Sequence, residues 1–216
     1  MSVAAREVGG GAVLHGDARP FVTASVVKAG ILAALLLQAR AAGRELDEEE
    51  RAHAAAMIER SDNEAASALW RTIGGRTGLD RAARTLGLPR TEGGPGGYWG
   101  LTRTTAADQL TLLQSLYGTA PSPLDGPARA YVQERLARVV EDQRWGVSAA
   151  GEAVGLKNGW MPRDATGLWV VHSVGRVTAG GRPVLLAVLS EGHATKADGV
   201  AAVERAARAA VRALAG

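Results

Sequence analysis

The fold of this chain is decided by the stretch from Thr23 to Leu37, which reads TASVVKAGILAALLL. Its Val, Ile and Leu residues fall on nearly every side of a helix, and Gly43 supplies a stop beyond it. A helix that is apolar all round is a buried one, so the stretch predicts a central helix that begins at Thr23 or Ala24. The one charged residue in this stretch, Lys28, would be costly there without partners.

Strands are expected at both ends of the chain. Apolar patches at Val3 and at residues 12–14 predict a small hairpin before residue 22, and Val- and Leu-rich runs at 168–177 and 183–189 predict a second hairpin. Between them, the sequence predicts helices at about 47–59, 63–72, 77–86, 104–117 and 127–140. An amphipathic helix rich in Ala and Arg is expected at about 196–214.

This layout predicts one α+β domain over residues 1–216, in which an antiparallel sheet is flanked by helices. Because the strands at the two ends are expected to share one sheet, the helical segment must fold beside it. The sheet lobe would comprise residues 1–22 and 146–216, and the all-helical lobe residues 23–145. A cleft between two such lobes is a common place for a binding site.

Composition narrows the class of partner. Of 216 residues, 46% are hydrophobic and 22% are charged, which is ordinary for a soluble globular protein. The net charge is +3 and no block of like positive charges occurs, so we expect no nucleic-acid partner. The apolar run from Ala29 to Leu37 is too short to span a bilayer, so no membrane partner is expected.

The same composition offers no site for a metal or another cofactor. The chain has no Cys, its four His are scattered without metal-ligand spacing, and it carries no dinucleotide or phosphate-binding fingerprint. We expect a monomer whose partner is a small-molecule or peptide-like amide substrate. Without a signal-peptide pattern the chain as written is expected in the cytoplasm, or outside the cell if it is a trimmed mature form.

Three short elements stand out against this background: Ser25-Val26-Val27-Lys28, Ser61-Asp62-Asn63 and Lys157-Asn158-Gly159. The chain has only three Lys and two Asn, and these elements contain two of the Lys and both Asn. Everywhere else but Lys196 the chain uses Arg for positive charge. Because a buried Lys can lose its proton and an Arg cannot, the choice of Lys points to proton transfer.

The spacing of Ser25 and Lys28 suits nucleophilic catalysis. Residues three apart on a helix share one face, and the N–H groups at a helix N-terminus favour an oxyanion. Burial would lower the pKa of Lys28, and a second cation from Lys157 would lower it further. A neutral Lys28 could then take the proton from Ser25, which makes this serine the candidate nucleophile.

Each element also has an ordinary structural interpretation. Ser25 could simply begin a helix, with Lys28 on its surface. Ser61-Asp62-Asn63 could be a helix N-cap, since all three residue types cap well. Lys157-Asn158-Gly159 could be a turn that precedes the C-terminal strands. Only the three together favour a catalytic site.

At these residues the chain resembles the class A β-lactamase and penicillin-binding protein superfamily, whose elements are S-x-x-K, S-D-N and K-T-G. The resemblance covers nearly the whole chain and is closest to short actinobacterial β-lactamase-related serine hydrolases. It implies a β-lactamase-like fold with a reduced helical lobe, catalytic roles for Ser25, Lys28, Ser61 and Lys157, and substrate contacts from Asn63, Asn158, Gly159 and Trp160. In particular, Asn158 would receive a substrate carboxylate with Lys157, and the main-chain N–H groups of Ser25 and Trp160 would form an oxyanion hole.

The sequence departs from that family in the loop that should supply a deacylating base. The loop from Thr91 to Trp99 contains a single acid, Glu92, and no E-x-x-L-N pattern follows it. Asn158 also stands where Thr or Ser is usual. We therefore expect a serine acyl-enzyme hydrolase that acts on β-lactam or acyl-peptide amides, with weak or slow deacylation. The alternatives are a β-lactam- or peptide-binding protein with little turnover, and a serine-dependent glutaminase-like amidohydrolase.

Overall fold

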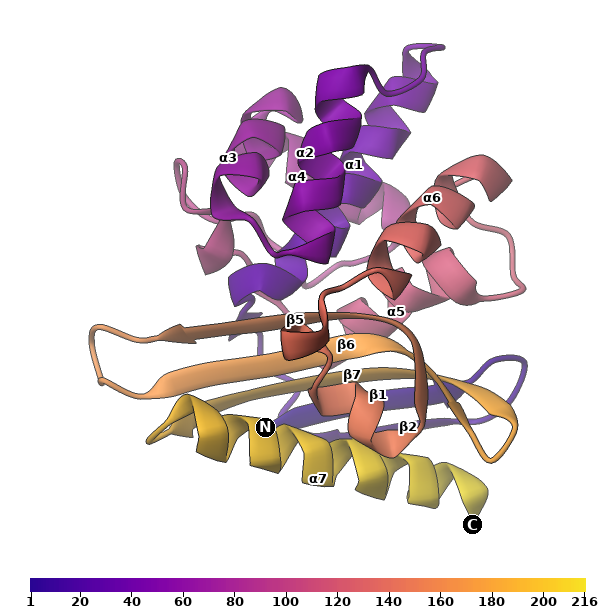
Figure 1. Cartoon of the computed structure of the whole chain (residues 1–216), viewed down its shortest axis with the longest axis vertical. Helices are drawn as coiled ribbons and strands as arrows, with labels where there is room; N and C mark the ends of the chain where they lie inside the picture. The colour runs from indigo at the N-terminus through magenta and orange to yellow at the C-terminus, as the bar shows by residue number, and fades with distance from the viewer.

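A computed structural model describes all 216 residues and shows an antiparallel sheet with helices on both faces (Figure 1). The five-stranded sheet has the order β2-β1-β7-β6-β5. Its strands are β1 (Ser2–Glu7), β2 (Ala12–Gly16), β5 (Glu152–Pro162), β6 (Trp169–Ala179) and β7 (Arg182–His193). Strands from both ends of the chain therefore pair in one sheet, and the predicted α+β class is confirmed.

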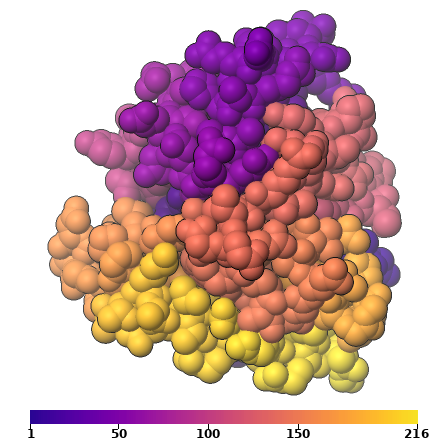
Figure 2. Space-filling view, viewed as in Figure 1, coloured from indigo at the N-terminus to yellow at the C-terminus, as the bar shows by residue number.

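The helices divide unequally between the two faces of the sheet. Helix α7 (Lys196–Ala215) covers one face, and the other six gather above the opposite face (Figure 1). These six are α1 (Val27–Ala41), α2 (Glu48–Glu59), α3 (Asn63–Thr72), α4 (Gly75–Leu86), α5 (Ala106–Tyr117) and α6 (Gly126–Ala137). Short 3-10 turns are η1 (Ala24–Val26), η2 (Trp99–Leu101), η3 (Glu141–Gln143) and η4 (Gly146–Ala150), and β3 (Phe21–Val22) pairs with β4 (Arg103–Thr104). In the space-filling view the α6–η4 segment lies at the front and runs from the helices above, past the sheet, to α7 below (Figure 2).

Helix α1 is the buried central helix that the sequence predicts. Its Ile31, Leu32 and Leu35 are fully inaccessible to solvent, and it packs against α3, α4 and α6. The segment Ala24–Ala41 is also long and apolar enough to meet the length and composition of a membrane span, although 67% of it is buried inside the protein. Burial on all sides explains its composition as that of a core helix.

The predicted helix starts are marked by side-chain caps. Asp47 and Glu50 form a reciprocal capping box at the start of α2, and Thr105 accepts a hydrogen bond from the Asp108 N–H at the start of α5. Asp62 accepts from the Ala65 N–H, so part of the Ser61-Asp62-Asn63 element does cap α3. The predicted helix ends are less accurate: α6 ends at Ala137 rather than near residue 140.

The third element lies inside a strand, so its interpretation as a turn is wrong. Lys157-Asn158-Gly159 occupies the middle of β5, which is the outer strand of the sheet. Successive strand residues direct their side chains to opposite faces. Lys157 and the Cα–H of Gly159 thus face α3 and η1, whereas Asn158 faces η3 and η4.

Candidate active site

Ser25 lies at the entrance of the central helix, in a cleft of about 470 Å³ between η1, α3, the η2 loop and the end of β5. Its side chain is partly exposed, and its hydroxyl makes no hydrogen bond. The preceding residue, Ala24, has a φ of +46°, a left-handed conformation that is costly for a residue with a Cβ. The backbone thus holds the serine in a strained turn at the cleft, as active sites often do.

Lys28 lies in the first turn of α1, three residues after Ser25, and is fully buried. Its Nζ donates to the Ser61 carbonyl at 2.6 Å, to Asn63 Oδ1 at 2.9 Å and to Ser61 Oγ at 3.1 Å. Every acceptor is neutral, so no opposite charge in direct contact offsets the cost of burying the ammonium. Burial lowers the pKa of Lys28 to about 7, against a smaller opposing effect of the Asp62 carboxylate.

Lys157 approaches the same hydroxyl from the sheet side. Its Nζ is fully buried and donates to Ser61 Oγ at 3.0 Å and to the Asn158 carbonyl at 3.2 Å. Burial, followed by the nearby charge of Lys28, lowers the pKa of Lys157 to about 7. The Ser61 hydroxyl therefore connects two amines that can both lose a proton near neutral pH. Ser61 itself has a φ of +57°, so a second left-handed residue lies at the site.

Gly159 lets the backbone of β5 approach the η1 turn that contains Ser25. A Cβ at this position would lie 2.8 Å from the Ser25 nitrogen, the Val26 nitrogen and the Thr23 carbonyl oxygen. No side chain fits there, so the glycine positions the strand edge against η1. Trp160 follows it and borders the same cleft as Ser25, while its indole lies 3.9 Å from Lys196 Nζ, measured to the ring centroid.

Asn158 does not occupy the position that the resemblance implies. Its side chain is fully buried, and its amide donates to the carbonyls of Gln143 at 2.8 Å and Trp145 at 3.0 Å. Both amide hydrogens are thus used by the main chain, and none is left for a substrate carboxylate. Asn158 fixes the segment around η3 and η4 to β5. The expected carboxylate contact is corrected to this structural one.

The loop expected to carry a base supplies an aromatic ring instead. Glu92 forms an ion pair with Arg76, its side chain is 60% exposed, and it does not line the Ser25 cleft. Trp99 of this loop contacts Lys28, with its ring centroid 4.7 Å from Lys28 Nζ. The indole N–H of Trp99 donates to Ser67 Oγ at 3.1 Å. Glu92, the single acid of this loop, is therefore not placed to act as a base at Ser25.

The structure reveals one supporting residue that sequence reasoning missed, His172. It is fully buried on β6, and its Nδ1 accepts from the Ser190 N–H at 3.1 Å. Its Nε2 must then carry the proton and donate to the Val22 carbonyl, 2.7 Å away and three residues before Ser25. Burial lowers the pKa of His172 to about 4, so the ring stays neutral at pH 7. A lone His in a strand pattern gives no signal of this contact.

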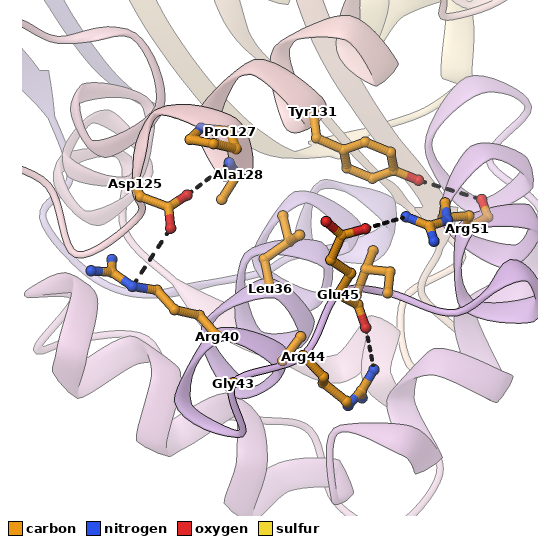
Figure 3. A pocket seen from close by; sticks show the side chains of 12 residues that line it. Leu36, Arg40, Gly43, Arg44, Glu45, Arg51, Asp125, Pro127, Ala128 and Tyr131 are labelled. Carbon is orange, nitrogen blue, oxygen red and sulfur yellow. Dashed lines mark hydrogen bonds and ion pairs between the residues drawn. The ribbon is translucent and has the colours of Figure 1, made fainter.

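Two other places could be mistaken for a site. Ser190 and His193 lie 2.9 Å apart, but Ser190 is fully buried and its hydroxyl donates to the Val171 carbonyl, so it is no nucleophile. A cavity of about 510 Å³ opens at the far end of α1 (Figure 3). Its Arg40, Arg44 and Arg51 are all paired with carboxylates, and no Ser, Thr or Lys lines it.

Comparison with known proteins identifies the family and the fold of this chain. The profile of the β-lactamase enzyme family matches residues 50–214, a range that begins after Ser25 and Lys28. Solved structures match nearly the whole chain: a β-lactamase from Chitinophaga pinensis is 16% identical with a TM-score of 0.80, covering 97% of this chain and 93% of that one. A class A β-lactamase from Mycobacterium abscessus is 20% identical with a TM-score of 0.74, covering 100% of this chain and 94% of that one. At such identities the likeness shows the fold.

Curated relatives are named "Putative lipoprotein LppW" in Mycobacterium tuberculosis and Mycobacterium bovis. They are 33% identical over 159 residues, which is 69% of this chain and 50% of the relative. The chain thus spans about half the length of the curated relatives it matches. That name gives no support to the expected cytoplasmic location. With a family match over residues 50–214 and the β-lactamase fold throughout, this chain belongs to the β-lactamase enzyme family.

Proposed function

We propose that this chain is a serine hydrolase that becomes acylated at Ser25 by a β-lactam or an acyl-peptide amide and releases the acyl group slowly. One observation carries this proposal: two buried amines donate to the single hydroxyl of Ser61, and both have a pKa of about 7, beside the cleft that holds Ser25. A general base works best when its pKa lies near the working pH. Lys28 meets that requirement.

In the proposed acylation, the Ser25 oxygen attacks the amide carbonyl carbon while neutral Lys28 takes the hydroxyl proton. A C–O bond forms, and the main-chain N–H groups of Ser25 and Trp160 stabilise the oxyanion. The C–N bond then breaks, and the leaving nitrogen takes a proton from Ser61, which Lys157 replaces. The lysine pair as a whole keeps the same number of protons, because Lys28 gains one and Lys157 loses one.

Asn63 would orient the substrate in this step. Its side-chain oxygen accepts from Lys28, while its amide hydrogens have no partner in the protein. Because Asn63 lines the cleft beside Ser25, those hydrogens are available to a carbonyl oxygen of the acyl group. This contact would hold the reacting carbonyl close to the serine hydroxyl.

Slow release of the acyl group is inferred from the chemistry around Lys28. Hydrolysis needs a base that activates water at the acyl carbon. The ring of Trp99 covers Lys28, and Glu92 is held by Arg76 away from the cleft. After acylation Lys28 carries the proton that it took from Ser25, so it must first lose that proton before it can activate a water molecule.

Intact-mass spectrometry with benzylpenicillin tests this proposal. We expect one covalent adduct per chain, no adduct in Ser25→Ala, and an unchanged adduct in Ser115→Ala, where a helix serine outside the cleft is removed. An adduct that persists for hours supports slow release, and one that disappears within minutes contradicts it. The absence of any adduct, together with ammonia released from glutamine, would support the glutaminase alternative and overturn the proposal.

A further inference from the structure

The cleft beside Ser25 is lined on one side by residues that take no part in the proposed proton transfer. Ser61 and Lys157 do not line it, whereas the η2 loop and the loop after β5 do, through Tyr98, Met161 and Asp164. In the proposed acylation the leaving group takes its proton from Ser61, so it departs on the Ser61 side. The acyl group stays on Ser25, and its side chain must therefore occupy the open cleft.

The charge of that cleft is unusual for a protein with a net charge of +3. No Lys or Arg lines it, and its single charged residue is Asp164. The Asp164 side chain is exposed and makes no hydrogen bond or ion pair with the protein, so its negative charge is not neutralised by a neighbour. The two amines of the site lie behind the cleft, where both are fully buried.

The same lining offers an aromatic surface. Tyr98 is 70% exposed and lines the cleft, so its ring is accessible to a ligand there. An exposed ring face attracts an ammonium or guanidinium group, and so does a nearby carboxylate. Both features favour one kind of ligand: an extended apolar chain that ends in a positive charge.

From these contacts we propose that the preferred substrates carry a cationic group on the acyl side chain, and that Asp164 selects for it. The acyl donor would be an amide or ester whose acyl chain ends in an ammonium or related cation. This inference rests on the proposed function, because it assigns the substrate class of the same serine. It makes Asp164 a specificity-determining residue and gives it no part in proton transfer.

A series of three p-nitrophenyl esters tests the inference. Their acyl chains are of matched length and end in an ammonium, a methyl or a carboxylate group: the esters of an aminohexanoic acid, of heptanoic acid and of pimelic acid. The release of p-nitrophenol gives the second-order rate constant of acylation for each ester. We expect the acylation rate constant to be highest for the ammonium ester, intermediate for the methyl ester and lowest for the carboxylate ester. At low salt each step should change the rate constant about threefold, and the two steps together about tenfold, because each unit charge interacts with Asp164 across a solvated cleft.

Two variants test whether Asp164 causes the difference between the rates of the three esters. In Asp164→Asn the ratio of ammonium to carboxylate rates should fall to near one, and in Asp164→Lys it should invert. Asp142→Asn is the matched control: this aspartate is exposed, unpaired and outside the cleft, so the wild-type ratio should persist. The wild-type ratio should also shrink in about 0.5 M NaCl, where charges are screened within a few ångströms.

The outcomes separate the inference from the proposed function. Equal rates for the three esters, with Ser25 acylated in each case, would overturn the cation preference and leave the proposed function intact. A preference that survives in Asp164→Asn would overturn the role of Asp164. If no ester acylates Ser25 and benzylpenicillin gives no adduct either, the proposed function fails and the inference fails with it.

Discussion

The two ends of helix α1 show how differently one protein can treat positive charge. At the N-terminal end, Lys28 is buried and donates only to neutral oxygens of Ser61 and Asn63. At the C-terminal end, Arg44 makes a two-pronged pair with the Glu50 carboxylate at 2.7 and 2.8 Å, which lowers the pKa of Glu50 (Figure 3 shows the surrounding cavity). Both ends border a cavity of about 500 Å³.

The two cavities are similar in volume, so volume does not distinguish the two ends of the helix. The groups that contact each cation do: neutral oxygens contact Lys28, and a carboxylate contacts Arg44. A carboxylate beside a cation holds the proton in place, and a guanidinium cannot lose it in any case. Burial without a carboxylate in contact lowers the pKa of a lysine and makes its proton easier to remove. The proposed acid–base chemistry therefore belongs to the Lys28 end, and no such role is proposed for the end with paired charges.

The largest effect should come from exchanging the two cation types. In Lys28→Arg, a base that can be neutral is replaced by one that cannot, so we expect the acylation rate at Ser25 to fall about a thousandfold or more, in line with the loss of general-base catalysis. The converse change at the other end, Arg44→Lys, should leave the rate unchanged. Stopped-flow acylation by a chromogenic ester measures both. Comparable losses in the two variants would contradict the assignment of chemistry to the Lys28 end.

A smaller effect is expected from glycines at the two ends. Gly159→Ala places a Cβ 2.8 Å from the Ser25 nitrogen, so β5 must move away from η1 and the acylation rate should fall about a hundredfold, as for a misplacement of about 1 Å. At the opposite end, Gly43 has a φ of +63° and no neighbour within 4 Å of an added Cβ. Gly43→Ala should therefore lower stability by about 1 kcal/mol and leave the rate unchanged. Urea unfolding and acylation, measured in parallel, distinguish strain at the site from a general loss of stability.

The smallest effect concerns stability against pH. The pKa of Lys28 is about 7 in the folded protein and about 10.4 in an unfolded chain. Between these values the unfolded chain binds the extra proton, so the free energy of unfolding should rise with pH, by about 1.4 kcal/mol per pH unit at most for this group. Lys28→Met should show a shallower rise between about pH 7 and about pH 9, and Arg44→Lys the wild-type rise. Parallel curves for wild type and Lys28→Met would mean that Lys28 keeps its proton in the fold.

Much of the fold was predictable because its signals are local. The apolar residues of α1 repeat within one helix, and Asp47 with Glu50 forms a capping box within a single turn. The sequence uses Lys at positions 28 and 157 although it is otherwise rich in Arg, which predicted two amines that can lose a proton. The structure brings both amines to the hydroxyl of Ser61. Their catalytic roles stay predictions.

What sequence reasoning missed depends on contacts between distant segments. The face on which Asn158 lies is set by the strand register, including a bulge between Ala153 and Gly155, which no residue pattern announces. The bond from His172 to the Val22 carbonyl joins residues 150 positions apart. The place of Trp99 over Lys28 likewise follows from how the η2 loop folds against α1, and the loop sequence contains no sign of it.

The ring of Trp99 over Lys28 gives the site an optical reporter of its own. With the ammonium 4.7 Å from the ring centroid, gain or loss of one proton changes the electric field across the indole. The emission of Trp99, isolated as the difference between wild type and Trp99→Phe, should therefore shift as this lysine titrates. The same signal should follow the proton in real time as an acyl group arrives on the neighbouring serine.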